Sequence, residues 1–147
     1  MKHQMKNLFK QGPITPDFIA SSIAKHSDKK NIGAHSIFLG QVRNDIIDQK
    51  EVIAIEYTAY EAMANDAFHV LRENIFQKYS LTCMHVYHSL GKVASGEISL
   101  FVFASSVHRT QAIEACQEIV ELIKKEMPIW GMEIFEDESS IWKKSII

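Results

Sequence analysis

Residues 98–130 read ISLFVFASSVHRTQAIEACQEIVELIKKEMPIW and carry a strand pattern directly into a helical one. The apolar run Leu100–Ala104 predicts a central strand that is buried on both faces. The following helix is expected to begin near Ser106 or Thr110. Pro128 should end it, because proline disfavours helical geometry in the preceding residue and cannot continue the helical ladder. The apolar side chains of the helix form one stripe: Ala112, Cys116, Ile119, Ile123 and Met127.

Two further helices are predicted before this stretch. Thr15 can cap a short helix whose first turn holds Pro16 and whose apolar positions extend to Ile23. Residues 60–79 have the pattern of an amphipathic helix. Its apolar residues recur at steps of four: Met63, Ala67, Leu71 and Ile75.

Strand patterns fill most of the remaining chain. Strands are predicted at 35–43, 51–59, 81–88 and 97–105, and an extended segment, an acidic turn and a last short strand should follow Pro128. Alternation in 51–59 places Ile53, Ile55 and Tyr57 on one face. Residues 44–50 should form a flexible loop, and Gly91 and Gly96 should lie in the turn between strands 81–88 and 97–105.

The order of these elements, α-β-β-α-β-β-α-β, contains no internal repeat, linker or low-complexity tract. It predicts a single α+β domain over residues 1–147, with a mixed or antiparallel sheet and three main helices. Residues 1–31 carry the weakest pattern, and we expect a mobile N-terminus there.

The charge of the chain is nearly balanced, with 16 basic and 18 acidic residues and a formal net charge of -2. No global field would draw such a chain to nucleic acid or to an anionic membrane, so any anion site must be local. The N-terminus lacks the apolar core of a signal peptide, and no run approaches the ~20 apolar residues of a membrane span. We therefore expect a cytoplasmic protein that binds neither nucleic acid nor membrane.

Basic residues mark three positions where an anion could bind. His108 and Arg109 lie at the expected start of the long helix, whose unpaired N–H groups and dipole attract negative charge. Arg43 follows a strand and a glycine, and Lys124 and Lys125 lie near the end of the long helix. Each position also has a plain structural reading: a solvated helix start, a surface arginine at a strand end, and cations that suit the helix dipole.

The cysteine and histidine spacings predict no metal centre. Cys83 and Cys116 lie in no zinc spacing and are interpreted as small buried hydrophobic residues without a disulfide. His85 and His88 are three apart on a predicted strand, so they face opposite sides and make a poor metal pair. No local motif supports a dinucleotide, nucleoside triphosphate, serine hydrolase or zinc protease function.

Five segments in chain order resemble the large, catalytic subunit of molybdopterin synthase. The similarity covers about residues 32–142, and each segment matches one motif of that family. The segments are FLGQVRND (38–45), IEYTAYEAMA (55–64), HSLGKVASGE (88–97), SSVHRTQAIEAC (105–116) and IKKEMPIW (123–130).

The resemblance implies an α/β-hammerhead fold and a sulfurtransferase that converts cyclic pyranopterin monophosphate into molybdopterin by installing two dithiolene sulfurs. The sulfur is implied to arrive as the C-terminal Gly-Gly thiocarboxylate of a small ubiquitin-like subunit. The implied assembly is a homodimer of large subunits within a heterotetramer. The pterin is a substrate, so no cofactor and no bound metal are expected.

The resemblance also implies the site residues. Lys124 matches the family's catalytic lysine, and two hypotheses describe its role: it stabilises a developing oxyanion, or it moves protons if burial lowers its pKa. Phe38 would form a pocket wall. The implied substrate-binding residues are Gln41, Val42, Arg43, His108, Arg109, Lys124 and Glu133.

The spacing of Arg109 and Lys124 provides a geometric test. They are 124 minus 109, or 15, positions apart, so one helix would hold their backbones ~22 Å from each other. The two side chains could hardly share one small substrate. We therefore predict a composite pocket across a two-fold interface, with Arg43 and Lys124 from one subunit facing His108 and Arg109 from its twin.

The chain departs from the family pattern at two positions. Gly131 stands where the family commonly has a second lysine, and Ser89 stands where an arginine often follows the turn histidine. Lys125, Lys143 or Lys144 are candidates to substitute for the missing ammonium, or Gly131 contributes only its backbone. An alternative function is a catalytically reduced homologue that acts as a partner-binding scaffold; a further one is an unrelated small-anion or nucleotide-binding dimer.

Overall fold

The computed structural model describes residues 7–143, which form three helices and eight strands. The helices are α1 (Pro16–Ala24), α2 (Glu61–Tyr79) and α3 (Arg109–Glu126). The strands are β1 (Phe9–Gln11), β2 (Ala34–Gln41), β3 (Ile46–Ile47), β4 (Lys50–Ala59), β5 (Cys83–Ala94), β6 (Ile98–Ser106), β7 (Ile129–Phe135) and β8 (Ser140–Trp142). The predicted α+β class with three helices is confirmed.

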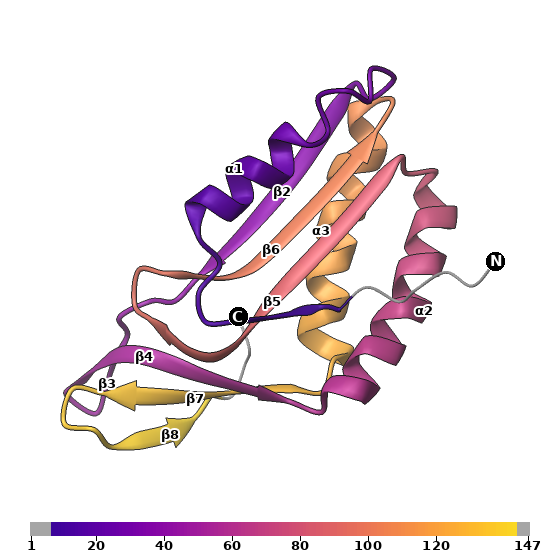
Figure 1. The fold of residues 1–147 in the computed structure, drawn as a ribbon. Helices are drawn as coiled ribbons and strands as arrows, with labels where there is room; N and C mark the ends of the chain where they lie inside the picture. The colour runs from indigo at the N-terminus through magenta and orange to yellow at the C-terminus, as the bar shows by residue number, and fades with distance from the viewer. Residues whose placement is uncertain (1–6, 144–147) are drawn as a thin grey trace.

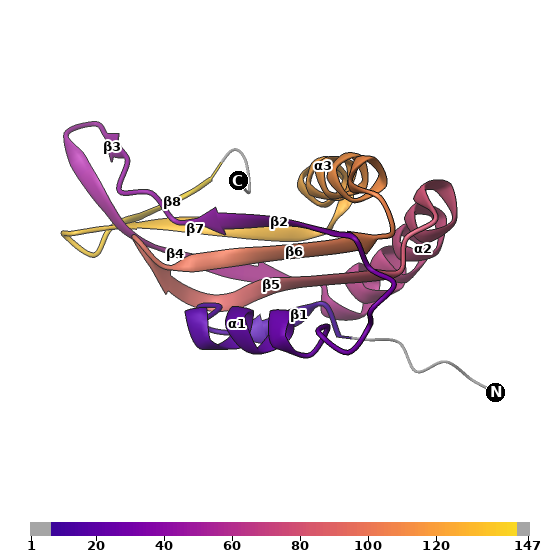
Figure 2. The same cartoon turned by 90° about the horizontal axis from the view of Figure 1, so that it is seen from above.

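All eight strands belong to one sheet, whose main path runs β2-β6-β5-β4-β7-β8 (Figure 1). The pairings along this path are antiparallel, whereas β1 joins β5 in parallel, so the sheet is mixed. Seen from above, α3 covers one face and α1 lies on the opposite face (Figure 2). α2 packs beside α3, and side chains of both helices enter the larger of two hydrophobic clusters.

The central strand β6 has the two-sided burial that its sequence predicts. Residues Leu100 to Ala104 are each 0% exposed. Their alternation divides them between the two clusters: Leu100, Val102 and Ala104 belong to the larger one under α2 and α3. Phe101 and Phe103 belong to the smaller one under α1.

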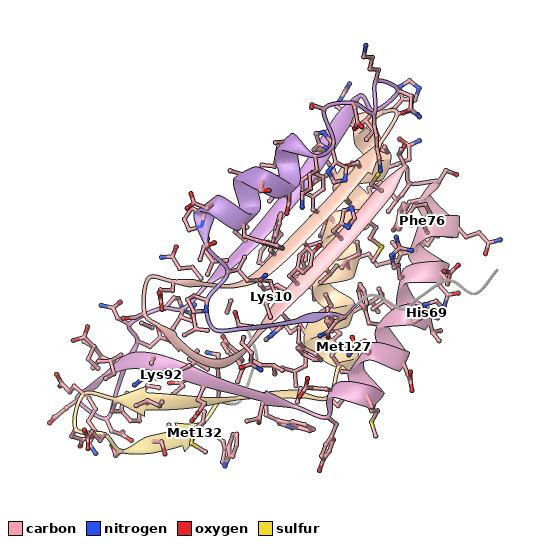
Figure 3. The ribbon with its side chains drawn as sticks, in the orientation of Figure 1. Lys10, His69, Phe76, Lys92, Met127 and Met132 are labelled. Atoms are coloured by element: carbon pink, nitrogen blue, oxygen red, sulfur yellow. The ribbon has the colours of Figure 1, made fainter. Side chains whose placement is uncertain are left out.

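The predicted boundaries of α1 and α3 agree closely with the structure. The Thr15 hydroxyl accepts a hydrogen bond from the Phe18 amide, which caps α1. The predicted apolar stripe of α3 is buried throughout. Met127 adopts an extended conformation where α3 ends before Pro128 and the chain turns into β7 (Figure 3).

The prediction that a turn follows His88 is wrong, because β5 continues to Ala94. Residues 83–88 of β5 pair with β6, and residues 91–94 pair with β4. Gly91 lies at this change of partner with φ of 81°, a left-handed conformation that L-residues rarely adopt. Of the two glycines predicted in the turn, only Gly96 lies there.

The flexible loop predicted at 44–50 is instead a tight hairpin between β3 and β4. Asp48 and Gln49 both have positive φ, as the two central residues of a hairpin turn with the favoured twist require.

In β4, Ile53 lies at a register shift and is 37% exposed, so it does not share the buried face of Ile55 and Tyr57. Met63 is exposed as well, and the buried positions of α2 are Ala64, Phe68, Leu71 and Ile75.

The N-terminal segment contributes more to the core than its sequence pattern indicated. Leu8 and Phe9 are buried in the larger cluster, and Phe9 pairs with His88 of β5. Residues 7–31 are thus held by β1 and α1, whereas residues 1–6, within the predicted mobile N-terminus, lie outside the described residues. None of the three helices in residues 7–143 is long and apolar enough to cross a bilayer.

His88 is a polar side chain inside this core, 1% exposed. Its Nδ1–H donates to the Ser89 carbonyl oxygen over 2.8 Å, and the Tyr57 ring meets the imidazole edge-on at 5.0 Å. Burial lowers the pKa of His88 from 6.5 to about 4, although the bond to Ser89 opposes this shift. The folded protein therefore holds a neutral imidazole at this position.

His88 should make the protein sensitive to acid. Between pH 6.5 and about 4 the unfolded chain binds a proton at His88 that the folded chain does not bind, so stability falls as the pH falls through this window. The loss should reach about 3 kcal/mol by pH 4. Urea unfolding across this range should show a shallower pH dependence for His88→Gln than for the wild type. His69→Gln, on the half-exposed side of α2 (Figure 3), should retain the full dependence.

Candidate functional site

A small pocket lies beside the end of β2 and reaches β4 and β7; we call it the Glu133 pocket. Its volume is about 30 Å³, and Val42 and the ring of Tyr57 form part of its wall. Its polar lining residues are Gln41, Arg43, Asp45, Ser99, Glu133 and Lys143. The pocket thus brings together four of the predicted substrate-binding residues: Gln41, Val42, Arg43 and Glu133.

The geometry of residues 41–43 follows from a β-bulge. The β2–β6 register shifts between Gly40 and Gln41, which re-aims the side chains that follow. The backbone of Val42 then accepts a hydrogen bond from Gly96 and donates one to Glu97. With Val42 2% exposed in the core, the flanking side chains of Gln41 and Arg43 extend outward.

Arg43 is held only loosely. Its guanidinium lies 3.2 Å from a carboxylate oxygen of Asp45, and the two side chains are 70% and 38% exposed. An ion pair so open to water contributes little stability. Arg43 can therefore exchange Asp45 for an anionic ligand at small cost.

Glu133 and Lys143 form the buried charged pair of the pocket. The Lys143 Nζ lies 3.5 Å from Oε1 of Glu133, and the two side chains are 13% and 7% exposed. Oε2 of Glu133 has no hydrogen-bond partner among the described residues. One buried carboxylate oxygen thus remains available to a ligand or water in the pocket.

Gly131 lies on the same face of β7 as Glu133, two residues away. A Cβ at this position would come within 2.9 Å of Ile55 Cγ2 and 3.4 Å of the Tyr57 ring, so these side chains occupy the space that a side chain at 131 would need. Met132, between them, points to the other side of the strand. The Lys143 amide donates to the Gly131 carbonyl oxygen over 2.8 Å, which returns Lys143 to the pocket.

Of the three lysines considered as substitutes at this position, Lys143 is the one that the structure places in the pocket. Lys125 is exposed on α3, where its Nζ lies 3.9 Å from Glu121. Lys144 is outside the described residues. Ser89, the other departure from the family pattern, is fully buried in β5 and does not line the pocket.

The pocket also contains a polar pair, Tyr57 and Ser99, that is absent from the predicted substrate-binding residues. The Tyr57 hydroxyl donates to Oγ of Ser99 over 3.2 Å. Burial raises the pKa of Tyr57, the nearby charge of Glu133 raises it further, and the bond to Ser99 opposes both. Tyr57 therefore stays protonated at neutral pH, so it can serve as a hydrogen-bond donor.

His108 and Arg109 lie at the start of α3, as predicted, and both are exposed. His108 is the N-cap residue, but its side chain makes no capping bond; the Ser106 hydroxyl donates to its carbonyl oxygen. The first turn of α3 contains no acidic residue, whereas the first turns of α1 and α2 contain Asp17 and Glu61. The N–H groups of this helix end can therefore receive an anion.

Lys124 lies in the last turn of α3 and is exposed. Because α3 is one continuous helix of 18 residues, the backbones of Arg109 and Lys124 are ~22 Å apart in the same chain. Within one chain, therefore, the helix-start pair and Lys124 do not form one site. The lining of the Glu133 pocket does not include His108, Arg109 or Lys124. Phe38, which was expected to form a pocket wall, packs against the larger hydrophobic cluster instead. The composite pocket stays a prediction.

Residues 11–126 match the family model described as MoaE protein. The chain belongs to the MoaE protein family. Curated relatives named molybdopterin synthase catalytic subunit include the Homo sapiens protein, 40% identical over 111 residues, and the Bos taurus protein, 37% identical over 113 residues. These alignments cover 76% and 77% of this chain but 58% and 59% of the relatives, so this MoaE family chain spans somewhat more than half their length.

Two solved structures have the same fold as this MoaE family chain. Molybdopterin synthase from Staphylococcus aureus is 28% identical with a TM-score of 0.81, and the match covers 96% of this chain and 98% of that one. A complex of subunits 1 and 2 of molybdopterin-converting factor from Helicobacter pylori contains a chain that is 24% identical, with a TM-score of 0.79. That match covers 92% of this chain and 88% of the other.

Removal of one partner of the buried pair should destabilise the fold. Lys143→Met keeps the length of the side chain but leaves the charge of Glu133 buried without its partner, at a cost of about 3 kcal/mol. Lys125→Met is the matched control: it breaks an exposed pair on α3 and should change stability by less than about 1 kcal/mol. Guanidinium unfolding at pH 7 measures both. Equal effects would show that Glu133 and Lys143 do not interact as a buried pair.

Proposed function

We propose that this chain is the catalytic subunit of molybdopterin synthase and acts in molybdenum cofactor biosynthesis. It would convert cyclic pyranopterin monophosphate into molybdopterin by installing the two dithiolene sulfurs. The observation that carries the proposal is the Glu133 pocket. Four residues assigned to substrate binding by resemblance to the family meet there: Gln41 at the end of β2, Val42 and Arg43 directly after it, and Glu133 of the distant β7.

The size of the Glu133 pocket supports a site shared between two chains. Its volume of about 30 Å³ holds one or two water molecules, whereas pockets that enclose a small organic ligand measure roughly 300–1,000 Å³. The pterin must therefore lie outside this pocket, with one polar group directed into it. His108 and Arg109 of a second copy would cover the exposed side of the substrate and bind its phosphate.

Within this site, Lys143 supplies the ammonium that position 131 lacks. It reaches Glu133 from the position directly after β8, while the side chains of Ile55 and Tyr57 occupy the space beside Gly131. Lys124, exposed at the end of α3, would act on the sulfur donor, where its positive charge stabilises the oxyanion that forms during transfer. The nucleophile is the partner's sulfur, so the buried Cys83 and Cys116 have no role in the reaction.

The proposed partner is a small ubiquitin-like subunit that carries sulfur on a C-terminal Gly-Gly thiocarboxylate. The Helicobacter pylori structure is described as a complex of subunits 1 and 2 of molybdopterin-converting factor, which supports a two-subunit assembly. The proposed arrangement is a homodimer of this chain with one small subunit at each end. This arrangement places two donor tails at two composite pockets.

The proposed activity is tested by mixing the purified chain with thiocarboxylated partner and cyclic pyranopterin monophosphate. Dithiolene product should form. Binding of the partner without product would favour the scaffold function instead. Absence of both binding and product would contradict the proposal outright.

Single substitutions should separate chemistry from binding. Lys124→Ala should abolish turnover and leave the fold intact, because an exposed lysine contributes little packing. Arg109→Ala should mainly weaken substrate binding, by roughly 1.5–3 kcal/mol or about 10-fold to 150-fold, through loss of a charge-assisted hydrogen bond. Steady-state kinetics and substrate titration measure the two effects. Wild-type activity in both variants would show that the site is elsewhere.

A mixed dimer tests the composite site directly. Lys124→Ala is coexpressed with the double variant His108→Ala/Arg109→Ala, neither of which should be active alone at low substrate concentration. Random pairing makes half of the dimers mixed, and each mixed dimer contains one intact site, so about a quarter of wild-type activity should return. If one chain built the whole site, no activity would return. A monomeric but fully active protein would also refute the shared site.

A further inference from the structure

Three potential metal ligands converge on the α1 side of the sheet, separate from the Glu133 pocket. Cys83 and His85 are two positions apart on β5, so their side chains share one face of the strand. His26 follows α1 immediately after its C-cap residue and approaches the same face. One ligand atom from each residue lies within 4.8 Å of the other two. None of the three lines the Glu133 pocket.

The two imidazoles point at each other through the same kind of nitrogen. Nε2 of His26 lies 3.1 Å from Nε2 of His85. Nδ1 of His26 lies 2.7 Å from the Ser22 carbonyl oxygen, which can only accept, so Nδ1 carries the proton. In the neutral ring, Nε2 of His26 therefore presents a lone pair toward His85 and Cys83. A backbone carbonyl that fixes the tautomer in this way is the usual support of a metal-binding histidine.

The surroundings favour the thiolate form of Cys83. His26 is 8% exposed and Cys83 is 5% exposed, and the ring of Phe103 stacks on His26 at 4.8 Å, so these two ligands are shielded from water, whereas His85 is partly exposed. Nζ of Lys29 lies 3.0 Å from Sγ of Cys83, where its positive charge would stabilise the negative charge of a thiolate. His35, which bonds Ser105 through Nδ1, lies beside His26 with 6.1 Å between ring centroids.

We propose that His26, Cys83 and His85 form a zinc site, with Nε2 of each histidine and Sγ of the cysteine as ligands. Tetrahedral zinc with these ligands, at about 2.0–2.3 Å, requires ligand atoms roughly 3.3–3.6 Å apart. The two Nε2 atoms are 3.1 Å apart, and all three ligand atoms lie within 4.8 Å of one another, so the observed distances bracket this range. Side-chain movements of about 1 Å would complete the tetrahedral geometry. On binding, the proton between the two Nε2 atoms moves to Nδ1 of His85, which stays a neutral imidazole, and the thiol proton of Cys83 is released to solvent. A water molecule takes the fourth position.

The function that the position of this site supports is to anchor α1. Within α1 only Ile19 is buried, and the smaller cluster beneath the helix contains four buried residues. Hydrophobic burial therefore holds α1 weakly. One zinc ion would connect His26, which follows the C-cap of α1, to His85 of β5, 59 positions further along the chain. Such a cross-link stabilises the folded state by a free energy that grows with the logarithm of its affinity for zinc.

Metal analysis of the untagged full-length chain is the first test, because a histidine tag would bind zinc itself. Protein purified without chelator and exchanged into metal-free buffer should retain one zinc ion per chain by mass spectrometry. Removal of zinc by a chelator should lower the melting temperature, and added zinc should restore it. Cobalt substitution should produce a thiolate-to-metal charge-transfer band, which reports cysteine ligation in the wild type without any variant.

Matched variants then assign the ligands. Three substitutions should each weaken zinc binding by at least about tenfold: Cys83→Ser, His26→Gln and His85→Gln. Loss of a group that only supports a metal ligand already costs about tenfold or more in affinity, so loss of a ligand should cost at least as much. Cys116→Ser removes the other cysteine, which is also 5% exposed, and should leave affinity and the cobalt band unchanged. His69→Gln is the corresponding histidine control. Circular dichroism verifies that each variant is folded.

Two results would overturn the proposal. The first is wild-type protein that neither retains zinc nor develops the charge-transfer band with cobalt. The second is zinc that remains bound with unchanged affinity in folded Cys83→Ser or His85→Gln, which would place the ion elsewhere. If the variants did not fold, the cobalt spectrum of the wild type alone would decide.

Discussion

The two-sided burial of β6 is the constraint on which the rest of the structure depends. A strand with no exposed side chain between Leu100 and Ala104 must be covered on both faces, and the two covers are unequal. α3 and α2 bring a large cluster to one face, whereas α1 brings a small one to the other. This inequality explains why polar groups gather at the edge of the α1 side, where His26, His85 and His35 surround Phe103.

The sequence predicted the elements whose signals are local. The Thr15 cap, the stripe of α3 and the stop at Pro128 each depend on neighbouring residues, and all three were right. The errors at β1 and β5 came from partners that are distant in sequence. β1 has three residues and no pattern of its own, and it exists because β5 offers an edge to Phe9. β5 likewise continues past His88 because β4 replaces β6 as its partner, which the residues around Gly91 alone do not reveal.

The same distinction applies to the candidate site. The segment Gln41–Arg43 could be found from its motif and from the glycine that precedes it, but its proximity to Glu133 depends on the pairing of β4 with β7. Spacing along the strand relates His85 to His88, three residues away, but gives no sign of His26, which is 59 positions away and in direct contact with His85. Lys143 was one of three equal candidates until β8 placed it beside Gly131. Side chains that converge from separate strands leave no signal in a single sequence.

The continuity of α3 restricts how this chain can change during evolution. The helix joins the basic pair at its start to Lys124 at its end without an internal break. An inserted or deleted residue would turn one end relative to the other by about 100° and shift it by about 1.5 Å. A single-residue insertion or deletion within α3 would therefore change the position of Arg109 relative to Lys124, and with it the geometry of the proposed composite site.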